Sequence, residues 1–589
     1  MSQLHYSAER SVQMLISILK HHNIKKIVAS PGATNVTFVG SLQSDPFFEV
    51  YSSVDERSAA YIACGLAAES GEPVVLSCTG ATASRNYMPG LTEAYYRKLP
   101  ILAVTATQNE NRIGHMVAQV IDRTQLPNDI AVLSEHVPVC HNADDEWSAN
   151  IKLNRAVLAL TYRGGGPVHI NLATEYNRDY SIEVLPPCRF IERSVYGQNM
   201  PELPKGRIAI WVGAHPHWNE EQTKAVNNFC DKHNAIVICD PSSNYHGEYR
   251  VDMALVMSQQ SYSAEKVNAN IQLGIHIGEI TADYKSAHII SSARKIWRVS
   301  KDGEIRDPYR KLVHVFEMEE SEFFTYYADK SIADSSKEFL NTCKSEYASA
   351  ISDFPDIPFS NLWIAKSTIN KLPENSVLHL GILNSIRSWG RFEFPDFVDG
   401  YSNTGGFGID GVMSTCIGGA LAMPDKLHFL VIGDLAFFYD MNVLGNRHLP
   451  VNVRILLVNN GRGQEFRNYS HPGSQFGEDA DRYIAAAGHY GKQSPDLVKH
   501  YSEDLGIKYL TASNKDEYIE ILPFFLDDQD KKKPILFEVF TSTKDENDAL
   551  YLSENFVSDA KGALKSAIKS AMPKSVVKEI RKIMNSSHK

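Results

Sequence analysis

The chain has 589 residues, which is too long for one hydrophobic core and predicts several domains. Apolar residues make up 43% and charged residues 22%, as in soluble globular proteins. The net charge of -11 argues against nucleic acid as a general partner, because binding to phosphates requires a basic surface. The sequence contains no run of about 18 apolar residues, so it predicts no membrane-spanning helix.

The eight cysteines are scattered along the chain, and no pair has the CxxC spacing of a zinc or redox site. We expect them to be reduced thiols, as in a cytosolic protein. The N-terminus, MSQLHYSAER, is charged and polar where a signal peptide needs an apolar stretch. The sequence therefore predicts a soluble protein of the cytoplasm.

Strand-like and helical segments alternate in three blocks, which predicts three α/β domains, each with a doubly wound parallel sheet covered by helices. The first block, 1–185, has helical spacing at 8–22 and 56–69, with strands expected at 24–30, 48–52, 73–79 and 101–106. The second block, 186–350, has strands expected at 207–214, 235–240, 271–278 and 295–300. The third block, 351–545, has a helix expected at 361–371 and strands at 376–381, 427–434, 452–460 and 534–540.

The tail, residues 546–589, differs from the rest of the chain. Between residues 561 and 589 it has eight Lys or Arg residues and one Glu, and its apolar residues have helical spacing. This pattern is typical of a surface helix. It also leaves open a contact with an anionic membrane surface or with an acidic partner.

The strongest functional signal is VIGDLAFFYDMNVLGNRHLPVNVRILLVNN, residues 431–460. One expected strand ends at Gly433 and Asp434, and the next ends at Asn460. Because parallel strands open on the same carboxyl edge of a sheet, Asp434 and Asn460 are expected to meet there. Their oxygen atoms are the hard ligands that Mg²⁺ prefers together with phosphate oxygens.

This segment resembles the diphosphate-binding signature of thiamine diphosphate-dependent enzymes of the acetolactate synthase and pyruvate decarboxylase superfamily. The resemblance extends over nearly the whole chain to about residue 545, and it implies pyrimidine-binding, central and diphosphate-binding domains. It also implies that Mg²⁺ is held by Asp434, Asn460 and the main-chain carbonyl of Arg462. Gly433, Leu435 and Ala436 are implied to lie against the cofactor, although Leu435 stands where most of the superfamily has Gly or Ala.

Further segments agree with this resemblance. Glu56, in SSVDERSAAYIACGLAAESG, matches the glutamate that activates the cofactor. The Gly-rich stretch 402–422 resembles the segment that contacts the aminopyrimidine, with Gly408 and Ile409 as cofactor-binding candidates, and Phe466 aligns with an aromatic residue near the cofactor. Because family members combine this glutamate with the diphosphate site of another subunit, the resemblance implies a homodimer or homotetramer with active sites at the subunit interface.

The motifs are most similar to the branch of the superfamily that acts in menaquinone biosynthesis. Gln119 and Arg387 carry over as polar active-site residues of that branch. Several substrate-binding cations of the branch are absent, because Thr34 and Thr404 stand where it has Arg. The resemblance therefore implies intact cofactor chemistry in an altered substrate pocket, with His115 and His471 as further acid–base candidates.

The predicted activity is decarboxylation of a 2-oxo acid and transfer of the resulting acyl carbanion to an acceptor. Two alternatives stay open: a simple decarboxylase that releases an aldehyde, and a non-catalytic scaffold. A scaffold would be expected to have lost the cofactor residues, but Glu56, Asp434 and Asn460 are all present. The sequence identifies neither the donor nor the acceptor.

Overall fold

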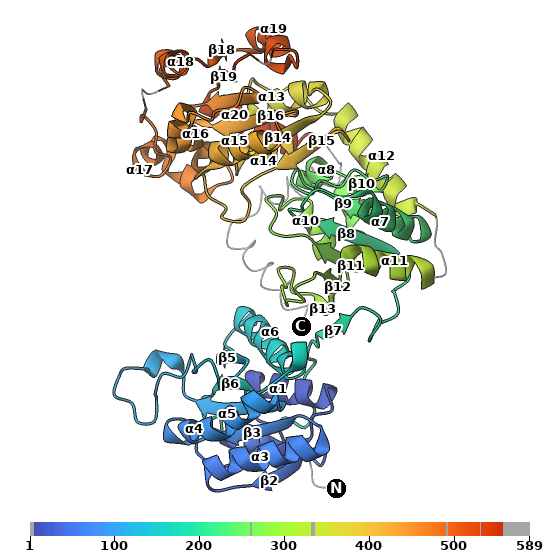
Figure 1. The fold of residues 1–589 in the computed structure, drawn as a ribbon, viewed down its shortest axis with the longest axis vertical. Coiled ribbons are helices and arrows are strands. Elements are labelled where there is room, and N and C mark those ends of the chain that lie inside the picture. Colours follow the sequence, from blue (N-terminus) through green and yellow to red (C-terminus); the bar gives the residue numbers. More distant parts are fainter. Residues whose placement is uncertain (1–4, 260–261, 331–335, 491–492, 531, 558–589) are drawn as a thin grey trace, which may run out of the picture. The chain divides into compact units, whose positions relative to one another are not determined.

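The computed structural model describes residues 5–259, 262–330, 336–490, 493–530 and 532–557. They form two compact units, the first comprising 1–199 and 303–317, and the second 200–302 and 318–589. The strands form three sheets, and every strand pairing in them is parallel (Figure 1). These sheets confirm the predicted α/β class, whereas the predicted basic helix of the tail, 561–589, lies outside the described residues.

The first unit contains a six-stranded sheet with the order β2-β1-β3-β4-β6-β5. Its strands are β1 (Lys26–Ala29), β2 (Glu49–Ser52), β3 (Val74–Cys78), β4 (Ile101–Thr107), β5 (Leu133–Val137) and β6 (Val168–Ala173). Its longer helices are α1 (Arg10–His21), α2 (Val36–Gln43), α3 (Glu56–Ser70), α5 (Met88–Arg97) and α6 (Ala143–Ala159), and the short α4 (Thr82–Asn86) precedes α5. Two strands of another sheet, β7 (Glu192–Val195) and β13 (Leu312–Glu317), also belong to this unit and pair with each other.

Two apolar clusters cover the faces of this sheet. One joins the buried sides of α1 and α6 to the strands, and the other joins α3 and α5 to them. Both clusters follow from continuous apolar strands, which are buried on both faces as expected for a parallel sheet.

The second unit holds five more strands of the second sheet, in the order β10-β9-β8-β11-β12, and the whole third sheet, in the order β15-β14-β16-β17-β19-β18. The five strands are β8 (Arg207–Val212), β9 (Ala235–Ile238), β10 (Arg250–Val251), β11 (Ile271–Ile277) and β12 (Lys295–Val299). The third sheet comprises β14 (Ser376–Leu380), β15 (Val398–Tyr401), β16 (Leu427–Gly433), β17 (Val453–Asn459), β18 (Lys508–Ala512) and β19 (Ile535–Phe540).

Helices connect these strands in the second unit. They are α7 (Glu220–Lys232), α8 (Ala254–Ser258), α9 (Tyr262–Asn268), α10 (Ala287–Ser291), α11 (Glu320–Lys330), α12 (Glu338–Ser352), α13 (Asn361–Thr368), α14 (Asn384–Trp389), α15 (Val412–Ala422), α16 (Asp434–Asp440), α17 (Ala480–Tyr483), α18 (Pro495–Asp504), α19 (Lys515–Leu526) and α20 (Thr543–Glu554). Within the described part of the chain, no helix has both the length and the apolar character needed to span a membrane. The predicted boundaries between three domains stay a prediction.

Candidate active site

The carboxyl edge of the third sheet brings Asp434 and Asn460 together. Strands β16 and β17 are adjacent and parallel, with Gly433 in register with Val458. Asp434 begins α16 directly after β16, and Asn460 follows β17. The Asp434 carboxylate accepts a hydrogen bond from the N–H of Leu435 at 3.0 Å, and the nearby N–H groups of Gly461 and Arg462 lower its pKa.

Both side chains are buried, at 4% and 9% exposure. Burial raises the pKa of Asp434 to about 7, although the N–H groups of Leu435, Gly461 and Arg462 lower it. Oδ1 of Asn460 is buried without a hydrogen-bond partner among the described residues. A buried carboxylate beside an unpaired amide oxygen fits a hard divalent cation, which would offset the cost of burying both groups.

Hydrogen bonds fix the loop that carries Asn460. Asn459 Oδ1 accepts from the N–H of Gly461 at 3.1 Å, and its Nδ2 donates to Glu538 Oε1 on β19 at 2.7 Å. Gln493 donates to the carbonyl of Asn459 at 2.8 Å. Sequence reasoning did not identify Asn459, Glu538 or Gln493, because their contacts join residues that are distant in the chain.

The sequence analysis also did not identify Glu546, a buried carboxyl group in the first turn of α20. It accepts hydrogen bonds from the N–H of Asn361 at 2.9 Å and from the Thr541 hydroxyl at 2.8 Å. Burial raises its pKa to about 7, and the charge of Asp434 adds to this shift. The carboxyl edge therefore concentrates acidic groups that favour a cation.

The other predicted cofactor residues of the second unit lie around this edge. Ala436, on α16, packs into the apolar core. Leu435 is half-buried, and its side chain lies near Gly463. The Arg462 guanidinium forms an ion pair with Asp481 at 2.7 Å. Its main-chain carbonyl is the atom expected to face the metal.

Three more predicted cofactor residues belong to segments next to helices. Gly408 lines a cavity of about 1100 Å³, and Ile409 packs against the core of α15. Phe466 is half-buried and meets His471 edge-on, with 5.4 Å between the ring centres. His471 caps the following turn by accepting the N–H of Gly473, so a structural role accounts for its position.

Arg387 lies on α14 and lines a separate cavity of about 520 Å³ in the second unit. Its guanidinium forms an ion pair with Glu465 at 2.7 Å and lies 5.7 Å from the centre of the Tyr284 ring. His471 also lines this cavity. Because Glu465 compensates much of the positive charge, the cavity is less cationic than Arg387 alone suggests.

Glu56 is the first residue of α3, and three residues separate it from the end of β2, as predicted. The side chain of Asp55 accepts from the N–H groups of Arg57 and Ser58 and so caps the helix. The half-buried Glu56 carboxylate has one weak contact, at 3.5 Å from Asn86 Nδ2.

Gln119 belongs to the irregular segment between β4 and β5. It is exposed and has a left-handed backbone, with a φ of 64°. Its carbonyl lies 3.1 Å from the position that a Cβ of Gly80 would occupy, so only glycine fits there without a shift. His115 is exposed in the same segment.

Thr34 and Thr404, which stand where the related branch has arginine, are both buried. The Thr34 hydroxyl contacts Thr79 Oγ1 at 2.6 Å and donates to the carbonyl of Ala106 at 3.0 Å. Thr404 lines the cavity beside Gly408. Neither side chain offers a positive charge to a substrate.

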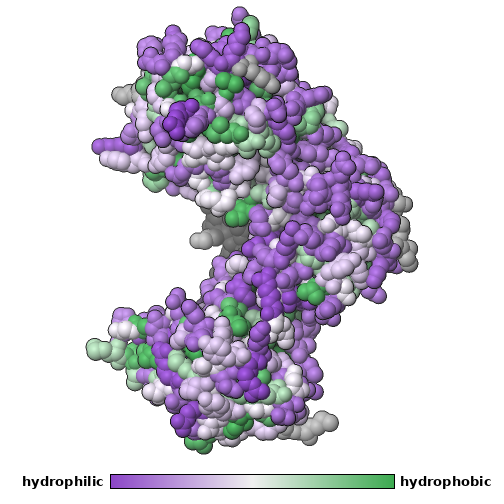
Figure 2. Space-filling model, viewed as in Figure 1, coloured by the Kyte–Doolittle hydropathy of each residue, from purple (hydrophilic) through white to green (hydrophobic). Residues whose placement is uncertain are grey.

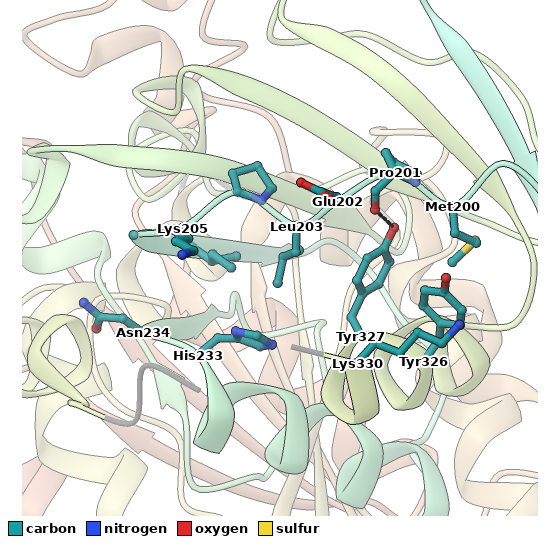
Figure 3. Close-up of a pocket in the computed structure, with 13 residues that line it drawn as sticks. Met200, Pro201, Glu202, Leu203, Lys205, His233, Asn234, Tyr326, Tyr327 and Lys330 are labelled. Atoms are coloured by element: carbon teal, nitrogen blue, oxygen red, sulfur yellow. Dashed lines mark hydrogen bonds between the residues drawn. The ribbon is translucent and has the colours of Figure 1, made fainter. Parts of the chain in front are cut away.

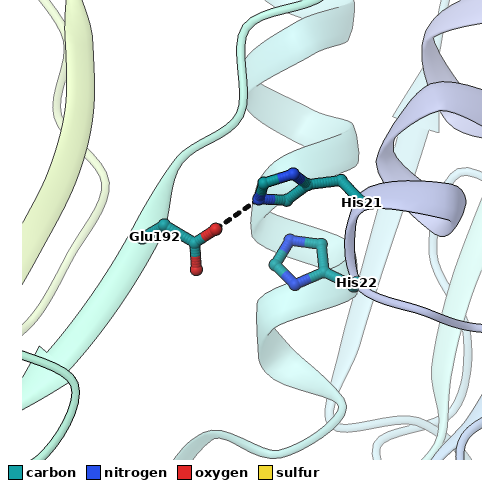
Figure 4. A group of neighbouring side chains, drawn as sticks. All are labelled: His21, His22 and Glu192. Atoms are coloured by element: carbon teal, nitrogen blue, oxygen red, sulfur yellow. Dashed lines mark hydrogen bonds and ion pairs between the residues drawn. The ribbon is translucent and has the colours of Figure 1, made fainter.

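Two other features contain none of the predicted site residues. A cavity of about 520 Å³ at the amino ends of β8 and β9 is lined by Lys205, His233, Tyr326 and Lys330, among others (Figure 3). In the first unit, His21, His22 and Glu192 place three possible metal ligands within 4.8 Å of one another (Figure 4). There, His21 already pairs with Glu192.

Known proteins resemble this chain along most of its length. Residues 10–126 match the family model of the thiamine pyrophosphate enzyme, N-terminal TPP binding domain. A 2-succinyl-5-enolpyruvyl-6-hydroxy-3-cyclohexene-1-carboxylate synthase of Bacteroides thetaiotaomicron is 32% identical over 560 residues, which cover 91% of this chain and 97% of the relative. Synthases with the same name from Phocaeicola vulgatus, at 31% identity, and Flavobacterium johnsoniae, at 25%, cover 94% and 91% of the chain and 98% and 97% of their own lengths.

The family match and the relatives agree with the geometry at the carboxyl edge of the third sheet. The chain is therefore an enzyme that belongs to the thiamine diphosphate-dependent family that includes these synthases.

Proposed function

We propose that this enzyme binds Mg²⁺ with its thiamine diphosphate, decarboxylates a 2-oxo acid and transfers the acyl carbanion to an acceptor. The observation that carries the metal assignment is the pair formed by the buried Asp434 carboxylate and the unpartnered Asn460 Oδ1. The relatives are named synthases, which favours transfer to an acceptor over simple release of an aldehyde.

In this proposal, Asp434, Asn460 and the carbonyl of Arg462 hold the metal ion, and the metal ion holds the diphosphate. Asn459 donates a hydrogen bond to Glu538 and accepts one from the N–H of Gly461, and these bonds keep the ligands in place before binding, so little ordering is required when the cofactor arrives. When bound, thiamine diphosphate supplies the electron sink for loss of CO₂.

In this proposal, Glu56 would hydrogen-bond the pyrimidine ring of the bound cofactor and would exchange a proton with it through its carboxyl oxygen. Its position at the first residue of α3 and its single weak protein contact leave the carboxyl group available for this task. Gln119 orients substrate polar groups, and the Arg387 guanidinium binds a substrate carboxylate.

The neutral Thr34 and Thr404 and the Arg387–Glu465 ion pair favour a substrate with less negative charge than the relatives' name implies. A guanidinium that already has a carboxylate partner gains less from a second one. We therefore propose a 2-oxo acid donor and an acceptor that together carry fewer carboxylates than the substrates of the named synthases.

We further propose that two copies of the chain complete each active site. Hydrophobic side chains are exposed near Glu56, with Val54 at 78%, Tyr61 at 49% and Ile62 at 45%. Figure 2 shows hydrophobic patches on the otherwise polar surface of this unit. A second subunit that covers this face would bury the apolar area and enclose Glu56.

The cytoplasm is the proposed location. All eight cysteines are free thiols, and a reducing compartment maintains that state.

The test is CO₂ release from a panel of 2-oxo acids by the purified protein with thiamine diphosphate and Mg²⁺, with and without candidate acceptors. Release that increases with an acceptor supports the carboligase. Full release without any acceptor indicates a simple decarboxylase. Release that is unchanged by complete removal of divalent metal would contradict the metal assignment.

A further inference from the structure

Arg123, in the segment between β4 and β5 of the first unit, is a buried guanidinium with few protein acceptors. The residue is 1% exposed. Nη2 donates to the carbonyl of Ala106 at 3.2 Å, whereas Nε and Nη1 have no hydrogen-bond partner among the described residues. A buried, unpaired charge of this kind is costly unless a ligand neutralises it.

The groups that face Arg123 are neutral or positive. They are the thiol of Cys78, the imidazoles of His136 and His169, and the guanidinium of Arg85. His169 is neutral near pH 7, because burial lowers its pKa to about 3. No described carboxylate pairs with Arg123, so the local balance of charge favours an anion.

Two other buried arginines of the chain have more protein acceptors. Arg454, with 0% exposure, donates to the backbone carbonyls of Val451, Val453, Asp527 and Asp530. Arg250 forms two hydrogen bonds with Asp252, at 3.0 and 3.2 Å. Nε of Arg454 also lacks a hydrogen-bond partner among the described residues, but both of these arginines have more acceptors than Arg123, for which one is described.

A small cavity adjoins the Arg123 guanidinium. Ser84, whose hydroxyl donates to the carbonyl of Ala81 at 2.7 Å, also lines it, together with Arg85, Thr105 and His169, and apolar side chains close the remainder. The cavity leaves about 10 Å³ for the centre of a water-sized sphere, which is room for about one such sphere. The Thr105 hydroxyl and both His169 nitrogens already bond within the protein, so the two arginines are the donors that remain for a ligand.

We propose that this cavity binds one monoatomic anion, a halide such as chloride, between Arg123 and Arg85. Two guanidinium groups provide the positive charge, and the small space excludes phosphate and carboxylate ligands. Nη2 of Arg123 keeps its bond to Ala106 while Nε and Nη1 face the halide. The bound anion thereby fixes Arg123 against the end of β4.

The Arg123 guanidinium of the proposed halide site lies near Gly80, and so does the segment that carries Gln119. The carbonyls of Gln119 and Ala106 and Nη2 of Arg123 converge on Gly80, at 3.1, 3.4 and 3.6 Å from the position of an added Cβ. The anion therefore ties this segment to the sheet. Any effect on turnover through Gln119 rests on the proposed function, whereas anion binding itself does not.

The test is the thermal stability of the full-length protein in sodium chloride and in sodium gluconate at equal ionic strength. At a chloride concentration ten times its Kd, we expect the Tm of the unfolding transition of the first unit to rise by about 3–6 °C. Arg123→Met keeps an apolar stem and removes the charge, so it is expected to lose the chloride response. In gluconate its Tm should equal or exceed that of the wild type.

Arg97→Met is the matched control, because Arg97 is a surface arginine of the same unit and its side chain is 54% exposed. It should respond to chloride as the wild type does. Wild-type crystals grown in sodium bromide provide an independent measurement, with an anomalous peak expected beside Arg123. A chloride response that persists in Arg123→Met, or bromide crystals without that peak, would overturn the proposal.

Discussion

The expected chemistry is divided between two regions, the carboxyl edge of the third sheet and the N-terminal end of α3. The two regions differ in how far the side chains are buried and held by their own unit. At the sheet edge, Asp434 and Asn460 are buried and held by hydrogen bonds from neighbouring backbone and side chains. At α3, Glu56 is half-buried beside exposed hydrophobic residues. In the proposed function, this difference means that one chain preorganises the metal ligands, whereas Glu56 requires a second surface to enclose it.

The largest effect is expected for Glu56→Gln. The amide cannot exchange a proton as the carboxyl does, so turnover should fall by about 10²–10⁴-fold while cofactor affinity changes little. Single-turnover CO₂ release and calorimetric titration of thiamine diphosphate would measure the two quantities. Glu69→Gln, at the exposed C-terminal end of the same helix, is the control and should keep full activity. An equal loss of cofactor affinity and turnover would indicate that Glu56 acts only in cofactor binding.

Asp434→Asn tests the other half of the comparison. Loss of a direct metal ligand should weaken Mg²⁺-dependent cofactor binding by more than the 10–100-fold that is typical of outer-shell partners. The Tm without metal should stay equal or rise, because the isosteric amide removes the cost of a buried charge. Asp425→Asn, on the surface of the same unit, is the matched control. If Asp434→Asn kept the wild-type affinity for Mg²⁺, Asp434 would not be a metal ligand.

The two halves also differ in how well the sequence predicted them. The meeting of Asp434 and Asn460 was predictable, because continuous apolar strands imply a parallel sheet and a parallel sheet aligns strand ends. The hydrogen bond between Asn459 and Glu538 was not, since it joins two strands whose order the sequence does not state. The edge strands β5 and β18 were missed because LSEHV and KYLTA lack the continuous apolar pattern of central strands.

Burial of Arg123 escaped prediction for a related reason. In VIDRTQLPND the arginine stands among polar and turn-forming residues, and such a segment usually lies at the surface. Tertiary packing against β4 buries it. The sequence therefore predicted the residues that regular strands position, and it failed where irregular segments fold back on the sheet.

Ile62→Glu tests whether the exposed face beside Glu56 is an interface. A charge at the centre of an apolar contact should weaken self-association by about 10–100-fold, through lost burial and a buried unpaired carboxylate. Sedimentation velocity over a concentration series would measure it. Val184→Glu, which places the same charge on an exposed hydrophobic residue elsewhere in the unit, should leave association unchanged. A protein that is monomeric before mutation would contradict the proposed dimer.

The smallest expected effect is a loss of stability at low pH, and its size should differ between the two units. In the second unit His379 and His428 share a hydrogen bond of 3.1 Å, and burial lowers their pKa values to about 3 and about 4. In the first unit His169 has hydroxyl partners at both nitrogens, at 2.7 and 2.8 Å, and a pKa of about 3. An unfolded histidine titrates near 6.5.

Below pH 6.5 the unfolded chain therefore binds protons that these native histidines do not bind, and stability falls as the pH decreases toward 4. At pH 4.5 each of these histidines should cost on the order of 2 kcal/mol, so the adjacent strands β14 and β16, which carry two of them, should lose more stability than β4 and β6, which carry one. Hydrogen exchange of the full chain between pH 7 and 4.5, corrected for intrinsic rates, should show greater loss of protection in β14 and β16 than in β4 and β6. His428→Gln should reduce that loss, and His448→Gln on the surface should not. Equal loss in all four strands would show that acid acts through groups other than these histidines.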